Sequence, residues 1–224
     1  MTTRALPILY CTWAAISITF AVTLAGLTPE SITRLLVIAF LLLQLPLRSV
    51  LARAFSRFAP RARFIALGTL LAAVVEGFHM ISVPVFPSLR ITPATPLAQG
   101  ILNYALDLLF TVPAYLVIFS VIWYFINRYE YGLWQYILLM GSGQAIGDGG
   151  LFFFLAAPAM LFFLPYPMSN YHAVNILPFL AARDHLSPDR EVSTRAYLVV
   201  PALIGTYLCC GALIQGVGRW AGLA

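Results

Sequence analysis

The sequence predicts an all-α fold, a polytopic transmembrane bundle of about seven helical segments. Hydrophobic residues make up 61% of the 224 residues and charged residues only 9%, whereas globular domains have roughly 45–50% apolar and about 25% charged residues. Apolar runs of about twenty residues, the length that crosses a bilayer, recur along the chain, and the arginines lie at the ends of these runs. We therefore expect a single integral-membrane domain over residues 1–224.

The charge balance points to membrane lipids as partners, with no nucleic acid. All 13 basic residues are arginine and the net charge is +5, and the positive-inside rule explains where the arginines lie. Arginine without lysine is typical of a GC-rich bacterial genome, so we expect the inner membrane of a bacterial cell. Whether the chain forms a homo-oligomer or has a partner in a membrane complex stays open. Cys11, Cys209 and Cys210 lack CxxC spacing, which argues against a disulfide framework or a zinc site.

The first two segments are expected at residues 6–27 and 29–47. The first is longer than the apolar core of a signal peptide, so we expect a retained helix. In the turn between them, Thr28 can cap the second helix, Pro29 suits its first position and Glu30 suits the positive end of its dipole.

A basic stretch, residues 48–63, follows the second segment and sets the expected topology. Five arginines occur in it: Arg48, Arg53, Arg57, Arg61 and Arg63. Because positively charged loops stay in the cytoplasm, we expect a cytoplasmic loop here. Arg4 falls on the same side, so we also expect a cytoplasmic N-terminus.

The third and fourth segments are expected at residues 64–86 and 96–126. Pro84 and Pro87 end the third segment, and Pro96 after a threonine repeats the cap-and-proline start for the fourth. The loop between the two segments then lies outside the cell.

Residues 133–164 form an apolar run that is too long for one ordinary span of roughly twenty residues. Its middle, GSGQAIGDGG, contains five glycines and Asp148, which favours a break. We predict two short helices, 133–147 and 150–165, joined by a tight or re-entrant turn. One long tilted helix, which would give six segments, is the alternative.

Prolines at positions 165, 167 and 178 argue against a regular span after this hairpin. The last segment is expected to open at residues 187–191, to become fully apolar by Ala196 and to end near Val217. With a broken hairpin, the connection before it lies in the cytoplasm with its arginines, which are Arg183, Arg190 and Arg195. One long helix would place them outside, so the positive-inside bias favours seven segments.

Four polar side chains are expected at one depth in the third and fourth segments. They are Glu76, His79, Asn103 and Asp107. Spacings of three and four residues place each pair on one helix face. A carboxylate at the bilayer centre costs about 2.5–3.5 kcal/mol on insertion scales, which marks such groups as candidates for function. We expect Glu76, His79 and Asp107 to be catalytic, and Asn103 to bind substrate.

Three interpretations of this cluster stay open from the sequence. The first is a proton-sharing or substrate-binding site. The second is a metal site: Glu-x-x-His on a helix is half of the di-iron bundle pattern, although the second copy and a HExxH signature are absent, so metal and cofactor are unknown. The third is an interhelical hydrogen-bond cluster without chemistry.

Further candidate substrate-binding residues lie in the broken hairpin and just after it. They are Ser142, Gln144, Asp148, His172 and Asn175. The Gly-Ser-Gly around Ser142 resembles the serine motif of the intramembrane serine proteases, and this resemblance would make His172 the base. Small-residue helix packing explains the same glycines without chemistry.

The preferred functional hypothesis is a membrane-embedded enzyme that acts on a lipid or isoprenoid-like substrate. A small transporter or proton-coupled permease, with GSGQAIGDGG as a broken helix at its site, is the alternative. A structural subunit of a membrane complex is the third. An enzyme needs its polar cluster in a closed pocket with lateral access, whereas a transporter needs two gates.

Overall fold

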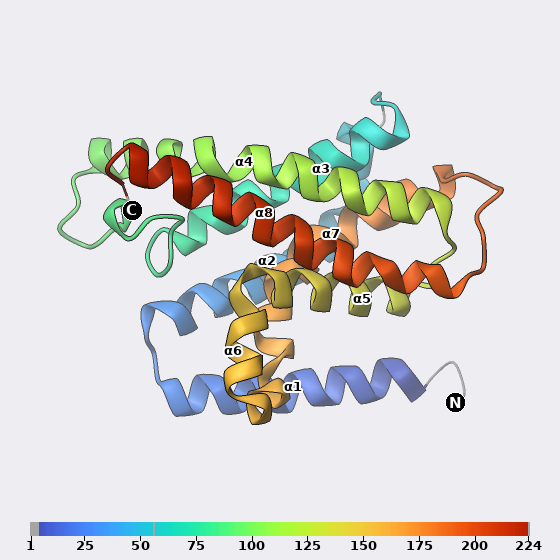
Figure 1. The fold of residues 1–224 in the computed structure, drawn as a ribbon, viewed down its shortest axis with the longest axis horizontal. Coiled ribbons are helices and arrows are strands. Elements are labelled where there is room, and N and C mark those ends of the chain that lie inside the picture. The colour runs from blue at the N-terminus through green and yellow to red at the C-terminus, as the bar shows by residue number, and fades with distance from the viewer. Residues whose placement is uncertain (1–4, 56, 224) are drawn as a thin grey trace.

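The computed structural model describes residues 5–55 and 57–223, and in these residues the regular elements are helices without any strand (Figure 1). The α-helices are α1 (Ala5–Ala25), α2 (Pro29–Ala54), α3 (Pro60–His79), α4 (Leu97–Arg128), α5 (Leu133–Ala145), α6 (Leu151–Ala156), α7 (Pro165–Ala182) and α8 (Val199–Trp220). Short 3-10 segments occur at Pro87–Leu89, Pro158–Phe163, Arg183–His185 and Thr194–Leu198. The predicted all-α bundle is confirmed.

Within the described residues, six segments are long and apolar enough to cross a membrane, as expected of a multi-pass membrane protein. They are Ala5–Ala25, Pro29–Leu51, Pro60–His79, Leu97–Arg128, Leu133–Ala156 and Thr194–Trp220. Helix α7 is more polar and is not among them. Twelve of its 18 residues are buried, so protein rather than lipid surrounds most of it.

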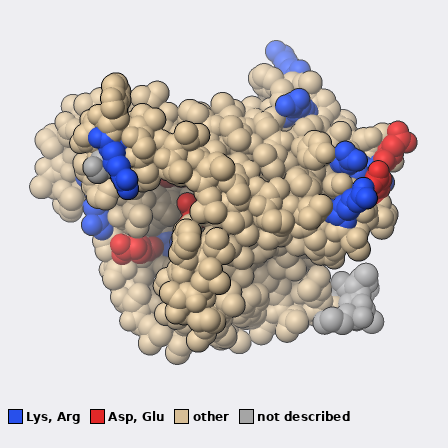
Figure 2. Space-filling model, viewed as in Figure 1, with Lys and Arg blue, Asp and Glu red and all other residues tan. Residues whose placement is uncertain are grey.

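The long helices run back and forth between two ends of the molecule (Figure 1). At the basic end, on the right of Figure 1, lie the connections 55–59, 129–132 and 183–198. At the opposite end lie the connections 26–28 and 80–96 and the C-terminus. Figure 2 shows charged side chains gathered toward these two ends, with largely uncharged surface between them. Helix α6 lies across the direction of the long helices.

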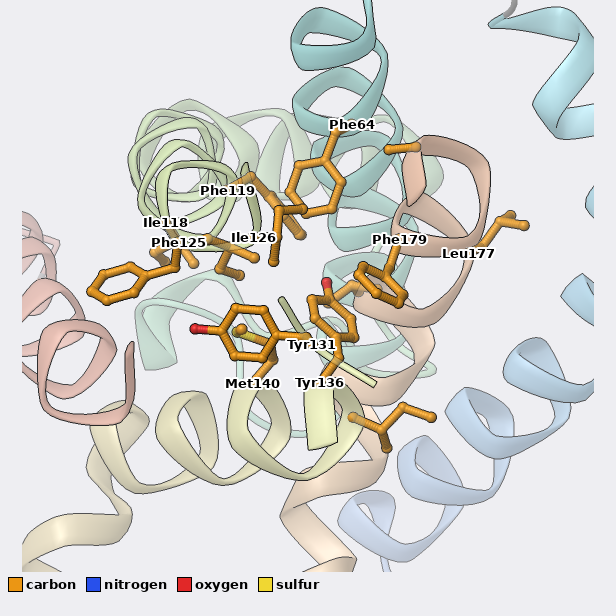
Figure 3. Packing of buried hydrophobic residues seen from close by; sticks show 14 of the residues in the cluster. Phe64, Ile118, Phe119, Phe125, Ile126, Tyr131, Tyr136, Met140, Leu177 and Phe179 are labelled. Carbon is orange, nitrogen blue, oxygen red and sulfur yellow. The ribbon is translucent and has the colours of Figure 1, made fainter. Parts of the chain in front are cut away.

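Helix α7 packs against α1, α2, α3 and α5 at the centre of the bundle. The ring of Phe179 on α7 stacks on Tyr136 of α5 with centroids 3.9 Å apart, inside the apolar core shown in Figure 3. The expectation of irregular structure here is wrong, because α7 is one continuous helix, although it is not among the segments that could cross a membrane. Pro165 and Pro167 occupy the first turn, where backbone N–H groups have no partner within the helix. Pro178 is buried, and neighbouring helices can stabilise a proline inside a membrane helix.

The third segment is shorter than predicted, because α3 ends at His79. The backbone turns at once: the N–H groups of Ser82 and Val83 both donate to the His79 carbonyl at 2.9 Å. The proline that follows Val83 disfavours a helical conformation in the residue before it, so the helix does not resume. Glu76 therefore lies in the last turn of α3, near the opposite end, and not in the middle of a longer helix.

The break predicted near Asp148 is present, and a single long helix is wrong. Asp148 has φ −83° and ψ 55°, and Gly149 has φ 87° and ψ −17°, neither of which is helical. A positive φ is accessible to glycine because it lacks a Cβ atom. The predicted helix 150–165 is also wrong, since α6 ends at Ala156. The 3-10 segment Pro158–Phe163 then leads into α7, which returns toward the basic end (Figure 1).

The basic stretch 48–63 is mostly helical, although a loop is predicted there. Helix α2 continues to Ala54 and α3 begins at Pro60, so the connection itself comprises residues 55–59. Arg4, which the sequence assigns to the same side, lies outside the described residues.

Candidate functional site

A polar pocket of about 460 Å³ lies among α2, α3, α4, α7 and α8, where α5 ends. Its lining includes Arg34, Glu76, His79, Tyr115, Asp148, Asn170 and Tyr171. A pocket of this size with several convergent polar groups is the usual form of a binding or active site. The structure thus brings three predicted site residues together: Glu76, His79 and Asp148.

The last turn of α3 supplies two of these groups. Tyr115 of α4 donates a short hydrogen bond from its hydroxyl to Oε1 of Glu76. Nδ2 of Asn170 on α7 lies 3.0 Å from Nε2 of His79, a geometry in which the amide donates to an unprotonated ring nitrogen. Both groups are therefore held by neighbouring helices.

The break after α5 places Asp148 in the same pocket. Tyr171 of α7 donates a 2.5 Å hydrogen bond to its Oδ2. Helix α8 packs closely on the chain just before the break, since a Cβ added to Gly147 would lie 2.9 Å from Cβ of Tyr207. The Tyr207 hydroxyl in turn donates to Oε1 of Gln144 at 3.0 Å. Contacts with two helices thus fix the position of the break.

Arg34 of α2 brings a guanidinium group to the polar pocket. Its Cζ lies 4.6 Å from the ring centroid of Tyr166, within cation–π range, and its Nη1 donates to the Pro167 carbonyl at 3.5 Å. Arg34 is absent from the site residues predicted from the sequence. The sequence could have marked Arg34 as a site residue, because Arg34 is the only charged residue between Glu30 and Arg48 and lies inside an apolar run.

An apolar groove of about 740 Å³ adjoins the polar pocket between α1, α6 and the 3-10 segment Pro158–Phe163. Leu24 and Phe153 line it and are 69% and 53% exposed, so the groove opens on the outer surface of the bundle. Asp148 and Pro167 line both the groove and the polar pocket. Ala145 also lines both, so the two spaces meet beside these three residues.

The chain has no match among protein-family models, curated proteins or solved structures. The chemistry of the site must therefore be derived from its own residues. Among the described residues, no group of three or more His, Cys, Asp or Glu side chains could hold a metal ion. Glu76 and His79 thus have no third ligand of these types in that part of the chain.

Asn103 and Asp107, grouped by the sequence with the pair on α3, are buried and hold the loop that follows α3. Oδ1 of Asp107 accepts a hydrogen bond from the N–H of Val85 at 2.8 Å. Nδ2 of Asn103 donates to the carbonyl of Leu89 at 3.1 Å. These contacts keep residues 80–96 against α4, and neither side chain lines the polar pocket.

Four other predicted site residues, Gln144 among them, lie outside the polar pocket. The hydroxyl of Ser142 donates to the carbonyl three residues earlier at 3.4 Å. Nε2 of His172 lies 2.5 Å from the hydroxyl of Tyr10. Nδ2 of Asn175 donates to the carbonyl four residues earlier at 2.7 Å. In the described chain no hydrogen bond joins Ser142 to His172, the contact that a serine protease needs.

Proposed function

We propose that this chain is a membrane-embedded enzyme that performs proton-transfer chemistry on a long-chain lipid or isoprenoid-like substrate. One observation carries the proposal: the polar pocket and the apolar groove meet at Asp148. A substrate whose apolar chain occupies the groove would bring its nearby carbons to this carboxyl group. Purely structural interhelical hydrogen bonds would need neither a pocket nor a groove at the same residue.

Asp148 and Glu76 are the two carboxyl groups that an acid–base reaction of this kind needs. In the proposed reaction, the protonated carboxyl group of Asp148 adds its proton to one carbon of a carbon–carbon double bond and leaves a carbocation. The carboxylate of Glu76 then removes a proton from a neighbouring carbon, and a new double bond forms. One proton enters and one leaves, so the product is an isomer of the substrate. Asp148 then takes up a proton from solvent and Glu76 releases one, which restores the two starting states.

The other polar residues of the pocket orient these carboxyl groups. Tyr171 holds Asp148 and Tyr115 holds Glu76, each through a hydroxyl that donates to one carboxylate oxygen. His79 lies three residues after Glu76 and shares its helix face, and its Nε2 accepts a hydrogen bond from Asn170.

We infer that the basic end faces the cytoplasm of a bacterial cell, with the polar pocket in the outer half of the membrane. The support is the distribution of arginines: Arg183, Arg190 and Arg195 lie in the α7–α8 connection, at the same end as the α2–α3 connection. The polar pocket lies toward the other end, because the last turn of α3 and Val85 line it.

Proton-coupled transport is the second candidate function, and the break at Asp148 favours it. Broken helices at membrane depth form the substrate and ion sites of many secondary transporters. A transporter moves its substrate unchanged across the membrane, whereas the proposed enzyme converts a lipid. The two functions therefore differ in what happens to a lipid in a closed vesicle.

Reconstitution of the purified chain into vesicles of total bacterial lipid extract tests the proposal. Chromatography with mass spectrometry should show one lipid consumed and an isomer formed by the wild type and by Arg219→Gln, a change at an exposed position of α8. Asp148→Asn should form no isomer. If no lipid changes, and a pH gradient instead drives solute flux that requires Asp148, the enzyme proposal fails and transport is favoured.

A further inference from the structure

The side chain of Arg34 is half-buried at the polar pocket, without a carboxylate at contact distance. Its Nε atom is buried and has no hydrogen-bond partner among the described residues. Nη1 donates to the Pro167 carbonyl at 3.5 Å, which is long for a hydrogen bond of this kind. In the described chain the ion pairs within 4.0 Å are Arg90–Glu30 and Arg183–Asp184, so Arg34 is not in one.

The two carboxyl groups of the pocket accept hydrogen bonds from tyrosines, and Asp148 interacts with Arg34 only at longer range. Tyr171 donates to Asp148, and Tyr115 donates to Glu76. A buried charge is costly unless an opposite charge and hydrogen bonds compensate it. The tyrosine ring beside Arg34 compensates part of its charge, but it leaves the Nε donor unused.

A second unused polar atom lies in the same pocket. Oδ1 of Asn170 is buried without a hydrogen-bond partner among the described residues, while the nitrogen of the same amide contacts His79. Asn170 follows Pro167 by three residues on α7, which places it on the helix face that Arg34 contacts. The amide nitrogen carries two N–H groups and contacts only His79 in the described chain, so one N–H group can donate to the group that Arg34 binds.

We propose that Arg34 and Asn170 bind an anionic head group, a carboxylate or a phosphate, at the end of the apolar chain of the substrate. Guanidinium groups pair with both anions through parallel N–H donors. Tyr166 and Pro167, which contact Arg34, also line the apolar groove. The head group therefore lies where the pocket and the groove meet, and the chain begins beside Asp148. This inference rests on the proposed function and specifies its substrate class.

Thermal unfolding of the purified full chain in lipid nanodiscs, with and without oleate, oleyl phosphate or oleyl alcohol, tests the head-group site. A ligand that binds the folded state raises Tm. Oleate, oleyl phosphate or both should raise Tm of the wild type and of Arg219→Gln, with half-maximal effect at a concentration at least about tenfold below that of oleyl alcohol. The acid that acts at the lower concentration identifies carboxylate or phosphate as the preferred head group.

Arg34→Gln should abolish this preference for the acids, and Arg34→Lys should retain part of it because the charge remains. The proposal is overturned if the alcohol acts at the same concentration as both acids on the wild type, a comparison that does not depend on any variant folding. It is also overturned if Arg34→Gln keeps the preference.

Binding and turnover separate this inference from the proposed function. Asp148→Asn should bind the acid as the wild type does while it forms no product. If acid binding requires Arg34 but no lipid is converted, the head-group site is supported and the proposed enzyme function is ruled out. If conversion requires Asp148 but Arg34→Gln binds the acid as the wild type does, the enzyme proposal stands and the head-group site is ruled out.

Discussion

Tyr171, near the centre of the bundle, donates a 2.5 Å hydrogen bond to Oδ2 of Asp148, the residue at which α5 breaks. This contact connects the most enclosed helix of the protein to the point where the polar pocket and the apolar groove meet. Because the hydroxyl reaches only one carboxylate oxygen, the other oxygen stays available to a substrate.

Replacement of Tyr171 by phenylalanine should lower turnover while the fold is retained. The change removes a hydrogen bond to the carboxylate that Asp148 becomes when its proton leaves, worth about 1.5–3 kcal/mol, so we expect a rate loss of about tenfold to a hundredfold. The assay is the rate of lipid conversion in vesicles.

Tyr10→Phe is the matched control for this change. It leaves Nε2 of His172 without its partner, outside the polar pocket, so it should cost about 1–3 kcal/mol of stability and leave the rate intact. If Tyr10→Phe loses more rate than Tyr171→Phe, the active site lies at His172 and not at Asp148.

Close packing of α8 on the end of α5 should make Gly147→Ala destabilising. The added Cβ would lie 2.9 Å from Cβ of Tyr207 and 3.0 Å from Cα of Ile204. Overpacking of this kind typically costs about 1–3 kcal/mol. Gly205→Ala, on α8, is the control because nothing lies within 4 Å of its added Cβ. Equal thermal stability of the two variants would disprove the close packing.

Asp107 should behave as an anchor of the loop rather than as a catalytic group. Asp107→Asn keeps the oxygen that accepts from Val85, and its second carboxylate oxygen is buried without a partner among the described residues. We therefore expect unchanged turnover and equal or higher stability. Asp107→Ala loses the hydrogen bond and should cost about 1–3 kcal/mol and expose residues 80–96 to limited proteolysis. If Asp107→Asn loses turnover while residues 80–96 stay resistant to proteolysis, Asp107 takes part in catalysis.

The apolar groove should be required for long-chain substrates. Ala21 of α1 lines it, so Ala21→Trp should fill part of the groove and raise KM for lipid by about tenfold or more, the factor that 1.4 kcal/mol of lost binding produces. Ala15→Trp adds the same ring at an exposed position of α1 and should leave KM unchanged. Equal KM values in steady-state assays of the two variants would show that the substrate enters elsewhere.

The fold class and the helix break could be predicted because they depend on local chemistry. Composition specifies lipid as the solvent, and Asp148 beside Gly149 marks a place where the helix cannot continue. Helix α7 could not be predicted in this way. Considered without the rest of the chain, its prolines and polar residues predict an irregular segment. The helix is stable because neighbouring helices bury 12 of its 18 residues.

The candidate site could be predicted only in part. The cost of a carboxyl group inside a membrane segment marks Glu76 and Asp148, but their shared pocket depends on how α5 and α7 pack. The early end of α3 at His79 turns Asp107 toward the loop instead. Tyr115 and Tyr171 carry no signal in the sequence, because tyrosine is common throughout membrane proteins as an interfacial residue.

Deuterium transfer from solvent to lipid is the most direct test of Asp148 as the proton donor. Vesicles with the wild-type chain, incubated in D₂O, should form a lipid product that carries carbon-bound deuterium, and Asp148→Asn should form none. A product without deuterium, or equal labelling by Asp148→Asn and the wild type, would contradict proton transfer from this residue.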